Sequence, residues 1–485
     1  MLVLRKAGGP NPAADSEHFA DERLRFVEWS GGDLASALNA GVAAAAGEYV
    51  TFLGVRDTLT PRAVDAVLET VTRSPGTSIF YSDERSLGGS HDIMKPVFSP
   101  ERLRSQFYFG NLTAYRRELI VSLEGIRSGF DGAELYDLAL RASVSGGVVE
   151  HLREALYSPG SDAGGAWGTG QFPETAIREV LKEHLERTGG GRVESVHSSG
   201  VFRTHRPVEG EPLVSIVIPT RGGIAEVRGI ERCMVIEAVR SVVELSTYEN
   251  YEFVIVIDDG APESVYSDLR TLAGDRLTFV QWSQPFSFSA KMNLGVLHAS
   301  GDYVLLLNDD VEVITPGWIE AMLALAQRPG AGLVGSMLYF EDDTIQHAGH
   351  AYYKTDVTHI GLNSERGSVG PGGGFLVERE VDGVTAACAM VSREVFLEAG
   401  GFSTLLPGNF NDVDLCMKVS VLGYQSIWTP YAELYHFESK SRDPRVAAYE
   451  IRTAWGRWEH RFYDSDYWPD DPHILYKREE QSGAW

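Results

Sequence analysis

Short apolar runs rich in β-branched residues alternate with segments of helical spacing in the second half of the chain. Residues 213–219 and 253–257 are almost continuously hydrophobic, as is typical of strands buried on both faces of a parallel sheet. Residues 233–245 have apolar positions at helical spacing, 293–299 also indicates a helix, and 303–307 is a third apolar run. This order of strand, helix and strand predicts an α/β domain with a mainly parallel sheet.

A faint internal repeat relates this region to the first part of the chain. The sequences NAGV at 39–42 and GEYV at 47–50 recur, at one constant spacing, as NLGV at 293–296 and GDYV at 301–304. A long period that contains helix and strand signals indicates two copies of one domain rather than a solenoid of short repeats. The first plausible strand of the first copy is 23–27, so we expect that copy to lack the strand that opens the second one.

The segments that join and follow the two copies differ from them in composition. A Gly-rich connector at 159–173 is followed by a charged segment of helical spacing, and the tail opens with a segment rich in Trp and Arg that also indicates a helix. We therefore predict a division into four parts. They are a first domain over 1–160, a linker with a helix over 161–209, a second domain over 210–440 and a C-terminal helical extension over 441–485.

The charge and cysteine content narrow the class of protein. The 485 residues carry a formal net charge of −25, which repels phosphate backbones and anionic lipids, so we expect no nucleic-acid partner. No apolar run approaches the roughly 18 residues of a membrane span, and the opening sequence lacks the apolar core of a secretory signal. Three cysteines without a CxxC spacing exclude a disulfide framework. A cytoplasmic location is the expectation that follows.

Three acidic clusters in the second copy are candidates for chemistry. DDG at 258–260 closes the second predicted strand, NDD at 308–310 closes the third, and NDVD at 411–414 opens a helix. Ligands of open parallel sheets bind beyond the carboxyl ends of the strands, so we expect the clusters to share one crevice. Carboxylates gathered there repel one another unless a cation is bound, and Mg²⁺ or Mn²⁺ with a diphosphate satisfies this need. Each cluster alone is a weak signal, because Asp-Asp-Gly is also a common turn.

With these clusters in this order, the chain resembles the family 2 glycosyltransferases of the GT-A fold, in the bacterial type with two such domains that assembles surface polysaccharides. The resemblance covers nearly the whole chain. It is carried by LVSIVIPTR, VIVIDDG, PFSFSAKMNLGVLHASGDYVLLLNDDVEV, TIQHAGH, VTAACAMVSREVF, FNDVDLCMKV and WTPYAELYHFESKSRD. It implies two GT-A-like, Rossmann-like domains.

The resemblance also implies roles for residues that bind the donor nucleotide. Asp259 would hold the nucleoside base, with Thr220 and Asp258 nearby, and Asp309 would lie near the ribose or the sugar.

Further roles concern the metal and the acceptor. Asp310 would bind Mn²⁺ or Mg²⁺, and Asp412 would be the general base. His436 matches a position that joins the metal shell in some relatives, although a hydrogen-bonded histidine in a strand-end loop is an equally good interpretation.

These roles describe a metal-dependent, inverting hexosyltransferase-type enzyme. It would move a sugar from a nucleotide-diphosphate donor to a saccharide or lipid-linked acceptor in cell-surface polysaccharide synthesis, at the inner face of the membrane. Peripheral membrane contact and a homo-oligomeric state stay open. The alternatives are a nucleotidyltransferase, which would need a Gly-rich basic loop after the first strand, and a catalytically silent scaffold of an assembly complex.

The first copy departs from the pattern at the positions of the metal ligands and the base. Gly54, Val55 and Arg56 stand where the second copy has NDD, and Leu135 stands opposite Asp412. We therefore expect the first copy to keep the fold without the activity, as a platform, a dimer surface or an acceptor guide. Arg56 could instead hold a phosphate through its guanidinium group.

Two weaker signals complete the candidates. The motif HAGH, with His347 and His350, has a spacing compatible with metal binding, but no third ligand is evident in the sequence, so acceptor contact or solvation is favoured. The aromatic residues Trp282, Phe286 and Phe288 are candidates for stacking on a sugar, although such residues more often belong to the core.

Overall fold

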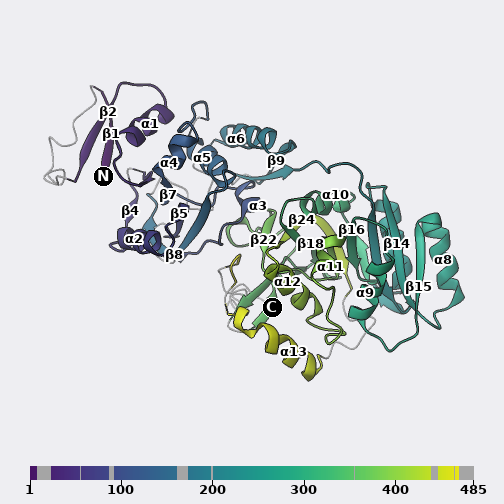
Figure 1. Ribbon diagram of the computed structural model, residues 1–485. Helices are drawn as coiled ribbons and strands as arrows, with labels where there is room; N and C mark the ends of the chain where they lie inside the picture. Colours follow the sequence, from purple (N-terminus) through teal and green to yellow (C-terminus); the bar gives the residue numbers. More distant parts are fainter. Residues whose placement is uncertain are drawn as a thin grey trace. The chain divides into compact units, whose positions relative to one another are not determined.

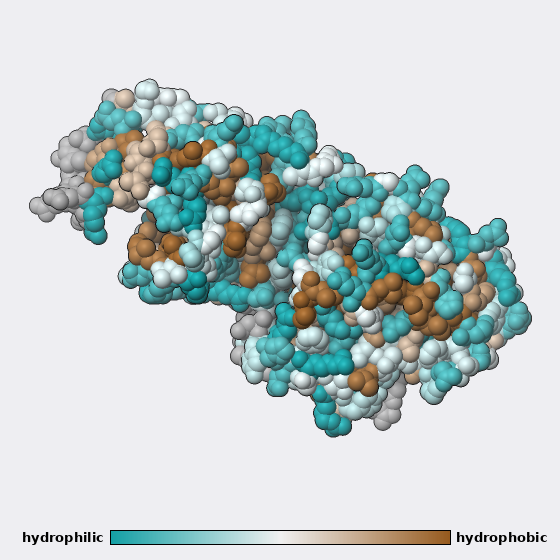
Figure 2. Space-filling model, viewed as in Figure 1, coloured by the Kyte–Doolittle hydropathy of each residue, from teal (hydrophilic) through white to brown (hydrophobic). Residues whose placement is uncertain are grey.

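The computed structural model describes residues 1–7, 23–54, 56–86, 92–130, 132–160, 173–197, 200–353, 356–437, 446–463 and 465–468. The chain forms two compact units, Met1–His205 and Arg206–Trp485. Most of the predicted Gly-rich connector and the end of the tail lie outside the described residues. Hydrophilic residues cover much of the face of each unit seen in Figure 2, and apolar residues form small groups between them.

The first unit combines two two-stranded sheets, β1-β2 and β9-β10, and a six-stranded sheet with helices (Figure 1). Its elements are β1 (Leu2–Lys6), β2 (Arg25–Trp29), α1 (Leu34–Ala44), β3 (Tyr49–Thr51), β4 (Thr58–Leu59), α2 (Ala63–Arg73), β5 (Thr77–Arg85), β6 (Asp92–Ile93), α3 (Pro100–Leu103), β7 (Thr113–Arg116), α4 (Arg117–Ser122), α5 (Glu134–Ser143), β8 (Val148–Ser158), α6 (Glu174–Arg187), β9 (Arg192–His197) and β10 (Val201–His205). The larger sheet has the order β3-β7-β5-β8-β4, with β6 on β5. Its two longest strands, β5 and β8, pair in parallel.

Two features of the first unit differ from the sequence-based expectations. The segment 23–27 is not the first strand, because β1 precedes β2 and pairs with it in parallel. At the spacing of the repeat, β1 and β2 correspond to the parallel pair β14 and β15, so the described residues contain no counterpart of β11, as expected. Helix α6, expected within a linker, contributes Ile177 and Leu181 to the same apolar cluster as Leu138 of α5. The apolar face of α6 thus completes the core of this unit.

The second unit is built on a ten-stranded mixed sheet with helices on both faces. Its elements are β11 (Val214–Thr220), β12 (Ile224–Val227), β13 (Ile230–Cys233), α7 (Met234–Leu245), β14 (Tyr251–Asp258), α8 (Glu263–Ala273), η4 (Gly274–Arg276), β15 (Leu277–Trp282), α9 (Phe288–His298), β16 (Tyr303–Leu307), β17 (Val311–Val313), α10 (Trp318–Ala326), β18 (Ala331–Tyr339), β19 (Ile345–His347), β20 (His350–Tyr353), β21 (Asp356–His359), η5 (Pro371–Gly373), β22 (Arg379–Val381), β23 (Cys388–Ser392), α11 (Arg393–Glu398), α12 (Asn411–Val421), β24 (Gln425–His436), α13 (Ala448–Trp458) and η6 (Glu459–Arg461). The main path through the sheet is β15-β14-β11-β16-β23-β18-β24-β17.

The two faces of this sheet are covered by different helices, as the alternating pattern predicts. Val239 of α7 and Met322 of α10 belong to one buried cluster, whereas Val296 of α9 and Leu415 of α12 belong to the other. Strands β15, β14, β11 and β16 are mutually parallel, so their carboxyl ends lie along one edge of the sheet. The predicted α/β class, with two units and mainly parallel sheets, is confirmed.

The internal repeat is also visible in hydrogen bonding. Asn39 of α1 donates from Nδ2 to the Ile126 carbonyl at 2.7 Å, and its Oδ1 accepts from the Ile126 amide at 2.9 Å. Asn293 of α9 binds the carbonyl and amide of Phe402 in the same way, both at 2.8 Å. The repeated asparagine therefore braces an equivalent loop in each unit.

Across the described residues, no helix is both long enough and apolar enough to pass through a membrane.

Candidate active site

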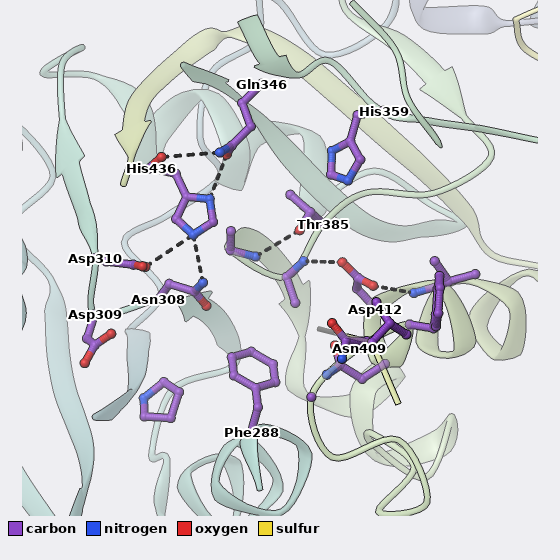
Figure 3. A pocket seen from close by; sticks show the side chains of 18 of the residues that line it. Phe288, Asn308, Asp309, Asp310, Gln346, His359, Thr385, Asn409, Asp412 and His436 are labelled. Carbon is purple, nitrogen blue, oxygen red and sulfur yellow. Dashed lines mark hydrogen bonds and ion pairs between the residues drawn. The ribbon is translucent and has the colours of Figure 1, made fainter. Parts of the chain in front are cut away.

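A cavity of about 260 Å³ opens in the second unit, where two of the three predicted acidic clusters, NDD at 308–310 and NDVD at 411–414, meet (Figure 3). Its walls come from the ends of β11, β16 and β24, from residues 385–387 and from the start of α12. The sequence-predicted residues that line it are Thr220, Asp309, Asp310, Asp412 and His436. Residues far apart in the chain thus share one space.

Asp310 and His436 lie side by side on one wall of this cavity. The Nε2 atom of His436 is 3.2 Å from Oδ1 of Asp310. Its Nδ1 atom lies 2.7 Å from Oε1 of Gln346, which only accepts hydrogen bonds, so Nδ1 carries the proton and Nε2 keeps its lone pair. The side-chain amide of Asn308 donates to this lone pair at 3.0 Å.

This wall has the donor set of a divalent-cation site. A carboxylate oxygen and an unprotonated imidazole nitrogen face the same space, and both are ligands that cations such as Mn²⁺ accept. The Oδ1 atom of Asn308 is buried and has no hydrogen-bond partner among the described residues. The residues present therefore fit a bound cation.

Asp309 lies next to Asp310 and is held by Thr220. The Thr220 hydroxyl donates to Oδ2 of Asp309 at 2.6 Å and accepts from the Gly222 amide at 2.9 Å. Burial, together with the negative charge of Asp310, raises the pKa of Asp309 to about 7. The pair of acids thus lacks sufficient compensating charge in the protein alone, which is the expected property of a site that binds a cation.

Asp258 ends β14 and Asp259 follows it, and neither is among the described residues that line the cavity. The Oδ1 atom of Asp258 pairs with the ammonium group of Lys291 at 2.5 Å, and this ammonium also donates to the Thr220 carbonyl at 2.6 Å. Asp259 is exposed, and its amide donates to the Trp282 carbonyl at 2.9 Å. Lys291 was not identified from the sequence, where it appears as a single charge in the helical segment FSAKMN.

Asp412 lies in the first turn of α12 and faces the cavity. Phe410, the residue immediately before α12, has φ 56°, and this left-handed conformation leads the chain into the helix. The Oδ1 atom of Asp412 accepts from the Val413 amide at 2.9 Å, and Oδ2 accepts from the Ala386 amide at 3.4 Å. The neighbouring acid Asp414 is instead fully buried.

The histidines of the HAGH motif are buried, so the expectation of solvation is wrong, whereas acceptor contact stays a prediction. His347 and His350 are fully buried, and His359 supplies the third nitrogen within 4.8 Å that the sequence did not reveal. Burial lowers the pKa of His347 well below its usual value and also lowers the pKa of His350, although the Asp412 carboxylate opposes the second effect.

The aromatic candidates divide between the site and the core. Phe286 and Phe288 line the cavity, and the Arg221 guanidinium lies 5.3 Å from the ring centre of Phe286. Trp282 packs against the apolar cluster that contains Val296.

In the first unit, Asp57 follows the positions that correspond to NDD. Its carboxylate accepts from the Gly54 amide at 2.8 Å, the Asn111 side chain at 2.9 Å and the Gly160 amide at 2.9 Å. This acid is therefore committed to holding local loops together.

Comparison with known proteins gives a consistent set of relatives. Residues 215–399 match the family described as Glycosyl transferase family 2. The chain is 35% identical over 486 residues to the uncharacterized protein y4gI of Sinorhizobium fredii (strain NBRC 101917 / NGR234), covering 93% of this chain and 51% of that protein. It is 33% identical over 432 residues to the O-antigen biosynthesis protein RfbC of Myxococcus xanthus, covering 87% of this chain and 33% of that protein. The chain thus spans about half the length of the first relative and about a third of the length of the second.

Two further matches are more distant. An N-acetylglucosaminyl-diphospho-decaprenol L-rhamnosyltransferase of Mycobacterium tuberculosis (strain ATCC 25618 / H37Rv) is 29% identical over 156 residues, covering 30% of this chain and 50% of that protein. A solved structure described as GalNAc-T7 with UDP, GalNAc and Mn²⁺ matches with a TM-score of 0.40 and 15% identity, over 51% of this chain and 48% of that one.

Proposed function

Residues 215–399 of this chain belong to glycosyl transferase family 2, and from this premise we propose that the second unit is a metal-dependent, inverting sugar transferase. It moves a sugar from a nucleotide-diphosphate donor to a hydroxyl group of a saccharide or lipid-linked acceptor. The similarity to the O-antigen biosynthesis protein supports a place in surface polysaccharide synthesis. The observation that carries the proposal is the convergence of Asp309, Asp310, Asp412 and His436 on one cavity.

The donor diphosphate is placed against Asp310 and His436. These two residues hold Mn²⁺ or Mg²⁺, which neutralises charge on the departing diphosphate when bound. Thr220 fixes Asp309 beside them through the 2.6 Å hydrogen bond, so that Asp309 lies toward the ribose or the sugar.

The nucleoside is assigned to the edge of the sheet beyond β14. Asp259 is exposed there and is able to accept hydrogen bonds from a base. Lys291 ties Asp258 to the Thr220 main chain, so it holds the ends of β14 and β11 at a fixed separation.

Asp412 takes the proton from the acceptor hydroxyl as that oxygen attacks the anomeric carbon. Its Oδ2 atom has the longer of the two amide contacts and is the atom assigned to receive the proton. Both amides orient the carboxylate, and such a base contributes about 10²–10⁴-fold in rate. A single displacement with one base inverts the anomeric configuration without a covalent intermediate.

A donor panel tests this function. Purified full chain is incubated with UDP-, dTDP- and GDP-sugars plus Mn²⁺ or Mg²⁺, and the released nucleoside diphosphate is measured. Metal-dependent release supports the transferase, release of pyrophosphate from a triphosphate supports the nucleotidyltransferase, and silence on both supports the scaffold.

The first unit is assigned a non-catalytic role as a platform, a dimer surface or an acceptor guide. Arg56 and Leu135 replace a metal ligand and the base, and Asp57 is occupied by three protein donors. The variant Asp310→Ala of the full chain tests this role, because turnover that survives it would have to come from the first unit. A lipid-linked acceptor would bring the protein to the inner face of the membrane.

A further inference from the structure

Three histidine side chains meet beside the cavity because of the way one hairpin pairs. Strands β20 and β21 are antiparallel, and their register places His350 directly opposite His359. His347 ends the preceding strand β19. Its ring lies 4.8 Å from that of His359 and 5.2 Å from that of His350, centre to centre, and the rings are tilted by 76–79°. One nitrogen from each ring lies within 4.8 Å of the other two.

One of these rings, that of His350, is incompletely satisfied by the described residues. His347 Nε2 accepts from the Thr385 amide at 3.2 Å, so its other nitrogen carries the proton and donates to Nδ1 of His359 at 2.8 Å. The Nδ1 atom of His350 is buried and has no hydrogen-bond partner among the described residues. His350 is only 1% exposed, so bulk solvent has little access to this ring. A buried polar atom without a partner is unfavourable unless a ligand or ion provides one.

The chemistry of this cluster differs from that of the Asp310 site. Three neutral imidazoles suit Zn²⁺, Co²⁺, Ni²⁺ or Cu²⁺, whereas a carboxylate-based site suits Mg²⁺ and Mn²⁺. Three protein ligands with a fourth position open are the usual composition of a zinc site in contact with a cavity. His350 and His359 both line the cavity, so the open position would face it.

The spacing is also compatible with such an ion. Metal–nitrogen bonds of about 2.0–2.1 Å place tetrahedral nitrogen ligands about 3.3–3.4 Å apart. The present separations, from 2.8 Å to at most 4.8 Å, bracket this value, so small ring rotations bring the nitrogens to it. His347 becomes a ligand when it gives up either the Nδ1 proton or the contact of Nε2 with the Thr385 amide. The Oδ2 atom of Asp412 lies 4.0 Å from Nε2 of His350, beside the cluster.

We propose that His347, His350 and His359 form a binding site for one divalent transition-metal ion of the Zn²⁺ class, separate from the Asp310–His436 site. The ion ties β19 to the β20–β21 hairpin and so fixes one wall of the cavity. This site does not depend on the proposed transferase function, and its test does not involve turnover.

The test uses the full chain, stripped with a chelator and titrated with Co²⁺. We expect one Co²⁺ ion with visible d–d absorption, displaced by Zn²⁺, both in the unmodified chain and in Asp310→Ala. His359→Ala should weaken this binding by about 100-fold or more, because loss of a ligand exceeds the usual effect of an outer-shell change. The matched control His298→Ala removes an exposed histidine of the same unit and should bind Co²⁺ normally.

Two results would overturn the proposal. One is an unmodified chain that takes up no Co²⁺, or takes it up only while Asp310 is present. The other is a folded His359→Ala variant, judged by circular dichroism, that still binds Co²⁺ with the original affinity. If His359→Ala fails to fold, electron paramagnetic resonance of Cu²⁺ bound to the unmodified chain decides, since coupling to imidazole nitrogens is required and its absence rejects the site.

Discussion

Replacement of Lys291 by methionine should destabilise the second unit, because the Asp258 carboxylate loses its charged partner. The Lys291 side chain is 0% exposed, and its ammonium group makes two short contacts, to Asp258 and to the Thr220 carbonyl. Burial lowers the pKa of Lys291, and the pairing with Asp258 opposes this shift, so the ammonium depends on that carboxylate. Lys291→Met keeps the apolar stem but leaves Asp258 and the carbonyl without their donor.

The size of the effect follows from burial. Removing one partner of a fully buried ion pair lowers the free energy of unfolding by about 3–5 kcal/mol. The Asp258 side chain remains 25% exposed and water reaches it, so we expect a smaller loss of about 2–3 kcal/mol. At about 2–4 °C per kcal/mol for a unit of this size, the melting temperature should fall by about 4–12 °C.

Tryptophan fluorescence during urea unfolding measures this loss. Trp318 and Trp428 are fully buried in the second unit and report on its unfolding. The control Lys182→Met makes the same replacement at an exposed position of the first unit and should leave this transition unchanged. The double variant Lys291→Met, Asp258→Asn should lose about 0.5–3 kcal/mol less free energy of unfolding than the sum of the two single losses, as expected for residues in contact.

A loss of less than about 1 kcal/mol in the free energy of unfolding of Lys291→Met, the typical value for an arbitrary substitution, would contradict a stabilising buried ion pair. Single effects of Lys291→Met and Asp258→Asn that simply add would also contradict it, because the two groups would then not be energetically coupled.

Three further outcomes are expected from the site and the repeat. Asp412→Asn should lower turnover by about 10²–10⁴-fold with donor binding intact, measured as diphosphate release, while Asp275→Asn, at an exposed acid of the same unit, should not change it. The pKa of Asp309 is about 7, and protons compete with the cation for this site. The affinity for Mn²⁺, measured by calorimetry, should therefore fall by up to about tenfold per pH unit below pH 7. Asp309→Asn should flatten this dependence of affinity on pH. Asn39→Ala and Asn293→Ala should each lower the free energy of unfolding by about 1–3 kcal/mol, because each leaves a buried backbone amide and carbonyl without their hydrogen-bond partner. An unchanged midpoint of denaturant unfolding would contradict the bracing role.

The sequence predicted those parts of the molecule that depend on local pattern. Continuous apolar runs gave β11, β14 and β16, and strand-end acids such as Asp310 lie in the cavity because parallel strands present their carboxyl ends at one edge. It could not reveal His359 as a partner of His350, because this contact depends on hairpin register, and two intervening residues lie outside the described part of the chain. Lys291 was missed because its partner is more than 30 residues away, and nothing local distinguishes a buried lysine from an exposed one.

A comparison of the two copies separates structural acids from acids that face the cavity. Asp137 of α5 binds the guanidinium groups of Arg127 and Arg141, and its counterpart Asp414 of α12 binds Arg457 at 2.8 Å. These acids are present in both copies and are buried in both.

The cavity acids behave differently. Asp412, only two positions before Asp414, becomes Leu135 in the first copy, and Asp310 becomes Arg56. The first copy still forms a sheet with helices, so neither acid is needed for that architecture. In the second copy, Asp309 and Asp310 are adjacent acids whose mutual repulsion raises the pKa of Asp309, an arrangement that packing does not require. Their presence in only the second copy is therefore best explained by the ligands that this cavity binds.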